Sequence, residues 1–165
     1  MGLSAAQEFA LAWVALAGLS DLRSRRIPNW LVGAAAGGAL LYLGATGRSL
    51  LGATPRETLE GCMLGLALTL PGYLPGKLGA GDVKFMSAIG LLGGWGCVLT
   101  SFVVGSLLAG LFAALWLLAD WLRQAGLPQW GLGRVNFPHP TRKSRLPFGA
   151  ALAAGFAASL YYPAG

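Results

Sequence analysis

The chain has 165 residues, of which 55% are hydrophobic and only 11% are charged. Soluble domains carry about a quarter charged residues, so this composition excludes an ordinary soluble domain and indicates a protein whose main solvent is lipid. The net charge of +6 would suggest nucleic-acid binding in a soluble protein. In a membrane protein, basic residues gather in cytoplasmic loops, and we therefore expect no nucleic-acid partner.

Long apolar runs broken by charges, Gly and Pro predict an all-α polytopic protein with about six transmembrane helices. A hydrocarbon core roughly 30 Å thick needs about 20 apolar residues per span, so we expect one transmembrane domain, residues 1–165, without a separate soluble domain. The fourth run is short for a crossing, and the third contains Pro71 and Gly72, so either could be a broken helix. The apolar runs in chain order are residues 3–20, 30–45, 59–74, 83–95, 98–122 and 146–162.

The distribution of basic residues predicts the orientation of these spans. If the N-terminus lies outside the cytoplasm, only Arg48 and Arg56 fall in external segments. This bias predicts six crossings with both termini in the periplasm, and a cytoplasmic loop at residues 123–145 that we interpret as an anchor near anionic lipid. The other ten basic residues then lie in cytoplasmic segments: Arg23, Arg25, Arg26, Lys77, Lys84, Arg123, Arg134, Arg142, Lys143 and Arg145.

Ionisable groups at membrane depth are costly, so the few acidic residues are candidate functional groups. Asp21 follows the first apolar run and Asp82 precedes the fourth, which places both at the cytoplasmic boundary, where they can converge. Two neighbouring carboxyl groups share one proton, so that the ionised partner activates a water molecule while the protonated partner polarises a carbonyl group. This arrangement meets the requirement of aspartic proteolysis. The six acidic residues are Glu8, Asp21, Glu57, Glu60, Asp82 and Asp120.

The residues alone leave other interpretations open. Asp21 precedes three arginines, and Asp82 could cap a helix while pairing with Lys84. The protein could instead be a transporter or channel whose aspartates bind a cation or relay protons, or a non-catalytic assembly factor. One histidine and two separate cysteines form no ligand pattern, so we expect no metal and no organic cofactor.

Two segments around these aspartates resemble the signature segments of the prepilin peptidases, the type IV leader peptidases of the G-x-G-D type. They are residues 21–29 (DLRSRRIPN) and residues 79–84 (GAGDVK). A further likeness at residues 145–149 (RLPFG) extends the resemblance over nearly the whole chain, which is most similar to the short form serving Flp (Tad) pili. The resemblance implies that Asp21 and Asp82 are the catalytic pair.

The resemblance also implies a location and a substrate. We expect an aspartic endopeptidase in the bacterial inner membrane that removes the basic leader from type IV (Flp-like) prepilins or pseudopilins at the cytoplasmic face. Longer relatives carry a zinc-binding domain and also N-methylate the pilin, whereas this chain has only a short loop there, so methylation is not expected. Beside Asp82, Gly79 and Gly81 lack Cβ atoms and are expected to let the chain turn and a substrate backbone approach.

Overall fold

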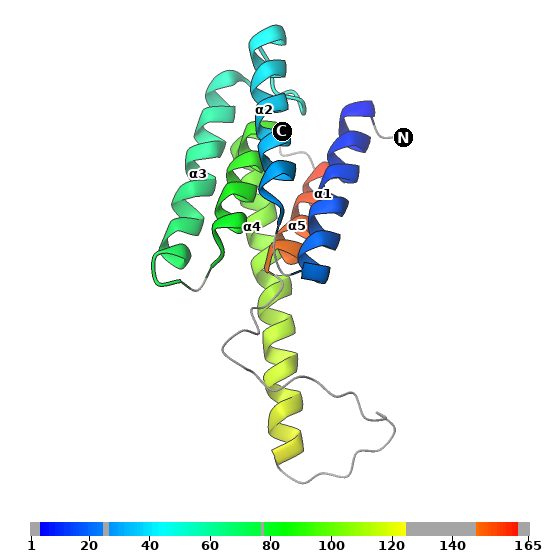
Figure 1. Ribbon diagram of the computed structural model, residues 1–165, viewed down its shortest axis with the longest axis vertical. Helices are drawn as coiled ribbons and strands as arrows, with labels where there is room; N and C mark the ends of the chain where they lie inside the picture. The colour runs from blue at the N-terminus through cyan, green and yellow to red at the C-terminus, as the bar shows by residue number, and fades with distance from the viewer. Residues whose placement is uncertain (1–3, 25–26, 77, 125–147, 162–165) are drawn as a thin grey trace.

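The computed structural model describes residues 4–24, 27–76, 78–124 and 148–161, and every regular element in these ranges is an α-helix. The all-α prediction is therefore confirmed. The helices form a bundle from which part of α4 projects at one end (Figure 1). In chain order they are α1 (Ala5–Ser24), α2 (Asn29–Thr46), α3 (Pro55–Tyr73), α4 (Ala80–Gln124) and α5 (Phe148–Tyr161).

Helix α4 consists of two arms that meet at Gly94, where the backbone is non-helical (φ 79°, ψ −172°). A positive φ of this kind is strained for residues with a Cβ atom, and glycine adopts it at low cost. The carbonyl group of Leu92, which loses its helical partner at the break, accepts a hydrogen bond from Leu51 N at 3.1 Å. The first arm is residues 80–93 and the second arm is residues 95–124.

The two arms run in opposite directions from the break at Gly94, and each packs on another helix (Figure 1). A Cβ atom added at Gly65 in α3 would lie 2.7 Å from Met86 O, and one added at Gly90 would lie 2.5 Å from Gly61 O, so the first arm is antiparallel to α3. On the other side, a Cβ atom at Gly105 would lie 2.9 Å from the Cα atom of Leu152 in α5. Backbones approach this closely only where small residues face each other.

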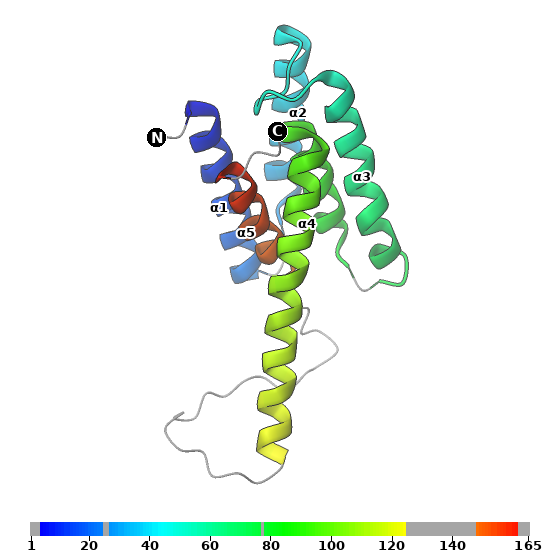
Figure 2. The same cartoon turned by 180° about the vertical axis from the view of Figure 1, so that it is seen from behind.

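Helices α1 and α5 also lie side by side and antiparallel, as both views show (Figure 2). Gln7 Nε2 near the start of α1 donates to Leu160 O near the end of α5 at 3.1 Å. Further along, a Cβ atom added at Gly18 would lie 3.1 Å from Cβ of Ala153. The end of α1 therefore lies beside the start of α5.

An aromatic cluster joins four helices in the core. The indole ring of Trp13 in α1 lies 5.1 Å from the ring of Phe85 in α4 and 6.3 Å from the ring of Phe156 in α5, measured between centroids. Its Nε1 donates a hydrogen bond to Leu31 O in α2 at 3.1 Å. All three rings are at most 5% exposed. The cluster therefore sets the relative positions of these helices by packing and by one buried hydrogen bond.

The helical segments follow the predicted apolar runs in order, the fourth and fifth runs correspond to the two arms of α4, and several helix ends differ from the predicted bounds. Helix α1 continues to Ser24 and α4 begins at Ala80, so Asp21 and Asp82 both lie within helices. The break considered at Pro71 does not occur: α3 continues through the proline, which lacks an N–H donor, to Tyr73. Leu74 N, three residues after the proline, donates to Leu70 O at 3.0 Å. The last predicted run, residues 146–162, extends beyond the described residues at both ends.

The outer surface of the bundle carries large apolar side chains. Trp30, Leu41 and Leu74 are 72%, 78% and 78% exposed, which is typical of a surface that another apolar phase covers. Among the described residues, one helix, Ala80–Leu122, is long and apolar enough to cross a membrane, and α5 is apolar but shorter. The prediction of six crossings stays a prediction.

The close contact between α3 and the first arm of α4 predicts that a side chain at Gly90 destabilises the protein. A Cβ atom there would lie 2.5 Å from the carbonyl oxygen of Gly61, and backbone atoms cannot rotate away. We expect Gly90→Ala to lower the free energy of unfolding by about 1–3 kcal/mol. Thermal unfolding of the purified protein in detergent measures this.

Gly38→Ala in α2 is the matched control, since a Cβ atom there meets nothing within 4 Å. Its melting temperature should stay the same or rise slightly, because alanine favours a helix by about 1 kcal/mol over glycine. Equal melting temperatures for the two variants would contradict the close α3–α4 packing.

Candidate active site

Three helix ends meet at the end of the bundle from which the second arm of α4 projects (Figure 1). Asp21 lies near the end of α1, Asp82 in the first turn of α4 and Gly149 in the first turn of α5. A Cβ atom built on Gly149 would lie 3.0 Å from Asp21 Oδ2 and 3.0 Å from Asp82 Oδ1. The two carboxyl oxygens are therefore no further apart than twice that distance, although the residues are distant in the sequence.

The carboxyl group of Asp21 is held by the start of α5. Asp21 is 5% exposed, and its Oδ2 accepts a hydrogen bond from Ala150 N at 2.9 Å. The first N–H groups of a helix have no partner within the helix, and the helix dipole favours negative charge at this end. Asp21 therefore caps α5 from another helix, and α5 stabilises the charged form of Asp21.

The carboxyl group of Asp82 is held by its own helix. Its Oδ2 accepts a hydrogen bond from Gly79 N at 3.1 Å, while Gly79 O accepts one from Asp82 N at 3.1 Å. This reciprocal arrangement is the acidic half of a capping box. The capping role considered for Asp82 from the sequence is therefore present, and it leaves Oδ1 on the side of Gly149.

The two predicted site glycines lie beside Asp82 in different roles. Gly79 supplies the N–H group that binds the carboxylate. A Cβ atom at Gly81 would lie 3.7 Å from Cβ of Ile27, which is an ordinary van der Waals distance. The left-handed turn that precedes α4 lies at Gly76, where φ is 72°.

Residues outside the predicted set complete the surroundings. Ile27 is 7% exposed, and a Cβ atom at Gly149 would lie 2.9 Å from its Cδ1, so its side chain forms an apolar wall beside the carboxyl groups. Lys84 Nζ donates to Asn29 Oδ1 at 3.2 Å, which connects the start of α2 to the first arm of α4. The likeness at residues 145–149 pointed to the region of Gly149, but its position beside both carboxyl groups is visible only in the structure.

The sequence profile of the type IV leader peptidase family matches residues 9–114, well over half of the chain. The chain belongs to this family. Searches of curated proteins and of solved structures each found no significant match. Membership makes the protein a membrane-embedded peptidase that acts on a prepilin-type substrate. The matched residues include Asp21 and Asp82 and end before α5, so the role of Gly149 rests on the geometry alone.

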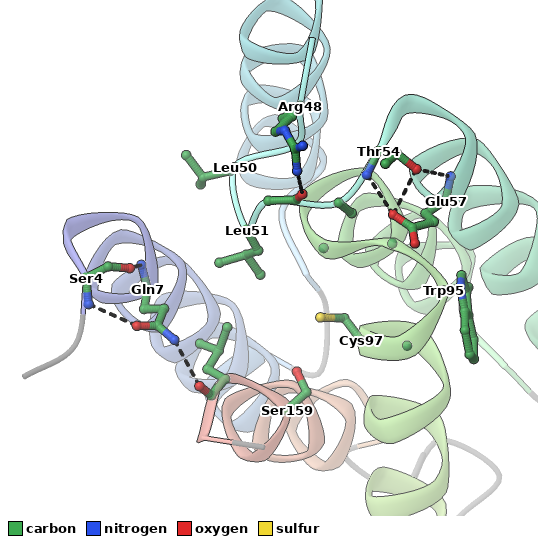
Figure 3. A pocket seen from close by; sticks show the side chains of 16 residues that line it. Ser4, Gln7, Arg48, Leu50, Leu51, Thr54, Glu57, Trp95, Cys97 and Ser159 are labelled. Atoms are coloured by element: carbon green, nitrogen blue, oxygen red, sulfur yellow. Dashed lines mark hydrogen bonds between the residues drawn. The ribbon is translucent and has the colours of Figure 1, made fainter. Parts of the chain in front are cut away.

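A cavity of about 550 Å³ in this leader peptidase is lined by neither Asp21 nor Asp82 (Figure 3). Gln7, Arg48, Glu57 and Cys97 are among the residues that line it. The backbone N–H group of Thr54, and to a smaller extent its hydroxyl group, donate hydrogen bonds that hold the pKa of the Glu57 carboxyl below its usual value. In the described part of the leader peptidase, no three His, Cys, Asp or Glu side chains gather in a way that could hold a metal ion.

The cap that Asp21 provides gives a stability prediction that is independent of catalysis. Asp21→Ala removes the acceptor for Ala150 N and should lower the free energy of unfolding of the leader peptidase by about 1 kcal/mol. Asp21→Asn keeps an oxygen acceptor and should lose less. Thermal unfolding in detergent compares the two variants, with Ser24→Ala as an exposed control on the same helix. Equal stability of the Ala and Asn variants would show that the hydrogen bond to α5 contributes nothing.

Proposed function

We propose that Asp21 and Asp82 are the catalytic pair of an aspartic leader peptidase. The observation that carries the proposal is the approach of one carboxyl oxygen from each residue to within 3.0 Å of the same point above Gly149. Both aspartates also lie within the residues that match the family. A pair of carboxyl groups at this separation can bind one water molecule between them.

In the proposed reaction, the two carboxyl groups share one proton, because two adjacent carboxylates repel each other. The ionised carboxylate takes a proton from the water molecule, whose oxygen attacks the scissile carbonyl carbon. The protonated partner gives its proton to the carbonyl oxygen, which forms a gem-diol. As the C–N bond breaks, the first carboxyl group passes the proton taken from water to the leaving amine nitrogen. One diol proton then returns to the partner, so the pair again holds one proton. Gly79 and Gly81 keep the first turn of α4 free of bulky side chains where the substrate backbone approaches.

The helix ends support one negative charge on this pair. Asp21 accepts an N–H group at the start of α5, and Asp82 accepts one at the start of α4. The positive ends of both helix dipoles therefore face the carboxyl groups. These N–H groups and dipoles stabilise one negative charge on the pair. Repulsion between two carboxylates favours retention of one proton.

The substrate that we propose is the basic leader of a type IV, Flp-like prepilin or pseudopilin, cleaved at the cytoplasmic face of the bacterial inner membrane. The excess of basic residues in the segments next to Asp21 and Asp82 supports this side of the membrane. The likeness of residues 21–29 and 79–84 to the short prepilin peptidases supports the substrate class. We propose peptidase activity without pilin methylation and without a metal or organic cofactor.

Asp21→Asn and Asp82→Asn are each expected to abolish leader removal. An amide preserves the shape of the side chain but cannot share and transfer a proton, and general acid–base action contributes about 10²- to 10⁴-fold. Co-expression with a Flp-type prepilin, followed by electrophoresis of the pilin, measures the loss of the leader.

The control is Asp120→Asn, which changes an aspartate near the end of the second arm of α4 and should process the prepilin normally. The variants must be compared at equal membrane abundance, because a missing protein imitates an inactive one. Complete processing by either Asp21→Asn or Asp82→Asn would exclude the paired mechanism and favour a non-catalytic role for that aspartate.

The proposed topology places both termini in the periplasm. Alkaline phosphatase fused to the C-terminus should be active, and the same reporter fused in the segment between α1 and α2 should be inactive, because that segment is basic. An active fusion after α1 together with an inactive C-terminal fusion would mean that the protein is inverted. The catalytic pair would then face the periplasm.

A further inference from the structure

We propose that Gly149 is a positioning residue for the reaction, and that the absence of a side chain there keeps open the space between the two catalytic carboxyl groups. This inference rests on the proposed aspartic mechanism. Gly149 is outside the residues that match the family, and α5 begins one residue before it, directly after residues 125–147, which the structure does not describe. The inference therefore depends on the contacts of α5 itself.

The space beside Gly149 is bounded by three groups. A Cβ atom would lie 3.0 Å from Asp21 Oδ2, 3.0 Å from Asp82 Oδ1 and 2.9 Å from Ile27 Cδ1. Non-bonded carbon atoms normally approach to about 3.5–4.0 Å, so even a methyl group would be crowded on three sides. The Ile27 methyl group can move by rotation of its side chain.

The carboxyl groups cannot move as easily, because backbone hydrogen bonds hold them. The same Oδ2 of Asp21 that a Cβ atom would meet accepts the N–H group of Ala150 at 2.9 Å. Asp82 is tied through its other oxygen to Gly79 N at 3.1 Å. An added side chain at Gly149 must therefore displace a carboxyl group against its cap or shift the start of α5.

The requirement for glycine is specific to this position. Gly81 lies in the signature segment, yet a Cβ atom there would meet Ile27 only at 3.7 Å, an ordinary contact. Gly18 packs tightly against Ala153 between the same two helices, α1 and α5, but a Cβ atom there meets no carboxyl group within 4 Å. Among Gly18, Gly81 and Gly149, a side chain meets both aspartates only at Gly149.

The reaction explains why this space must stay open. A water molecule that both carboxyl groups bind must lie within hydrogen-bond reach of each of them. A side chain at Gly149 competes for the space beside both oxygens and pushes them apart. Because the added side chain occupies the space proposed for the attacking water molecule, the effect should fall on the rate of the chemical step and not on substrate affinity.

The first test is a graded series of Gly149→Ala and Gly149→Val, purified in detergent, with a purified Flp-type prepilin as the substrate. We expect kcat to fall at least about tenfold for Gly149→Ala and more than about 10²-fold for Gly149→Val, since small displacements of catalytic groups have effects of this size. KM should stay within about twofold. Gly18→Ala, which crowds the same pair of helices, should keep kcat within about twofold of the unaltered protein at equal folded concentration.

The second test measures the contact without any substrate. Gly149→Ala should lower the melting temperature, and the decrease should be smaller when Asp82→Ala is already present, because one of the crowded oxygens is then absent. An equal decrease in both backgrounds would overturn the assigned contact. Wild-type kcat in Gly149→Val would also overturn the inference.

The results separate this inference from the proposed function on which it rests. If Asp21→Asn and Asp82→Asn are inactive while Gly149→Val cleaves at the normal rate, only the role of Gly149 is wrong. If Asp21→Asn or Asp82→Asn still cleaves, the paired mechanism is wrong, and the kinetic role of Gly149 falls with it. In that case the melting temperatures still report whether Gly149 contacts the carboxyl groups.

Discussion

The indole ring of Trp13 connects the helices on which the site depends. It packs against Phe85 of α4 and Phe156 of α5, and its N–H group binds the backbone of α2. Asp82 precedes Phe85 by about one helical turn, so the aromatic contacts restrict the sliding and rotation of the helix ends that carry functional groups. Tryptophan suits this position because its ring packing sets the separation of the helices, while its N–H hydrogen bond sets the orientation of the ring.

Glycines allow the backbones of neighbouring helices to approach closely, which packing of aromatic rings does not allow. In lipid, apolar side chains gain little by contacting each other instead of lipid tails, so association depends on tight van der Waals packing. The contacts of Gly61 and Gly65 with the first arm of α4, and of Gly105 with α5, show this packing on both sides of the reversal at Gly94. At these positions, glycines within the apolar runs act as packing residues.

Capping and catalysis are compatible uses of the same carboxyl groups. Each aspartate accepts a backbone N–H group at the start of a helix, which fixes the orientation of its carboxyl group and favours the presence of charge. A carboxylate can accept several hydrogen bonds at once, so a bond to a backbone N–H group is compatible with binding of a water molecule. A preorganised pair of this kind loses little conformational entropy when substrate binds, and this supports the proposed function more than proximity alone would.

The sequence by itself determined the all-helical fold, through its long apolar runs, and identified the aspartates, because ionisable groups are rare in such runs and these two lie in recognisable segments. It also indicated the family, which the profile match confirmed. Only the tertiary structure decided that α4 reverses at Gly94, that Asp21 caps α5, and that a side chain at Gly149 would meet both carboxyl groups. These features depend on contacts between residues far apart in the chain, and local patterns of hydrophobicity and spacing carry no information about which helix ends meet.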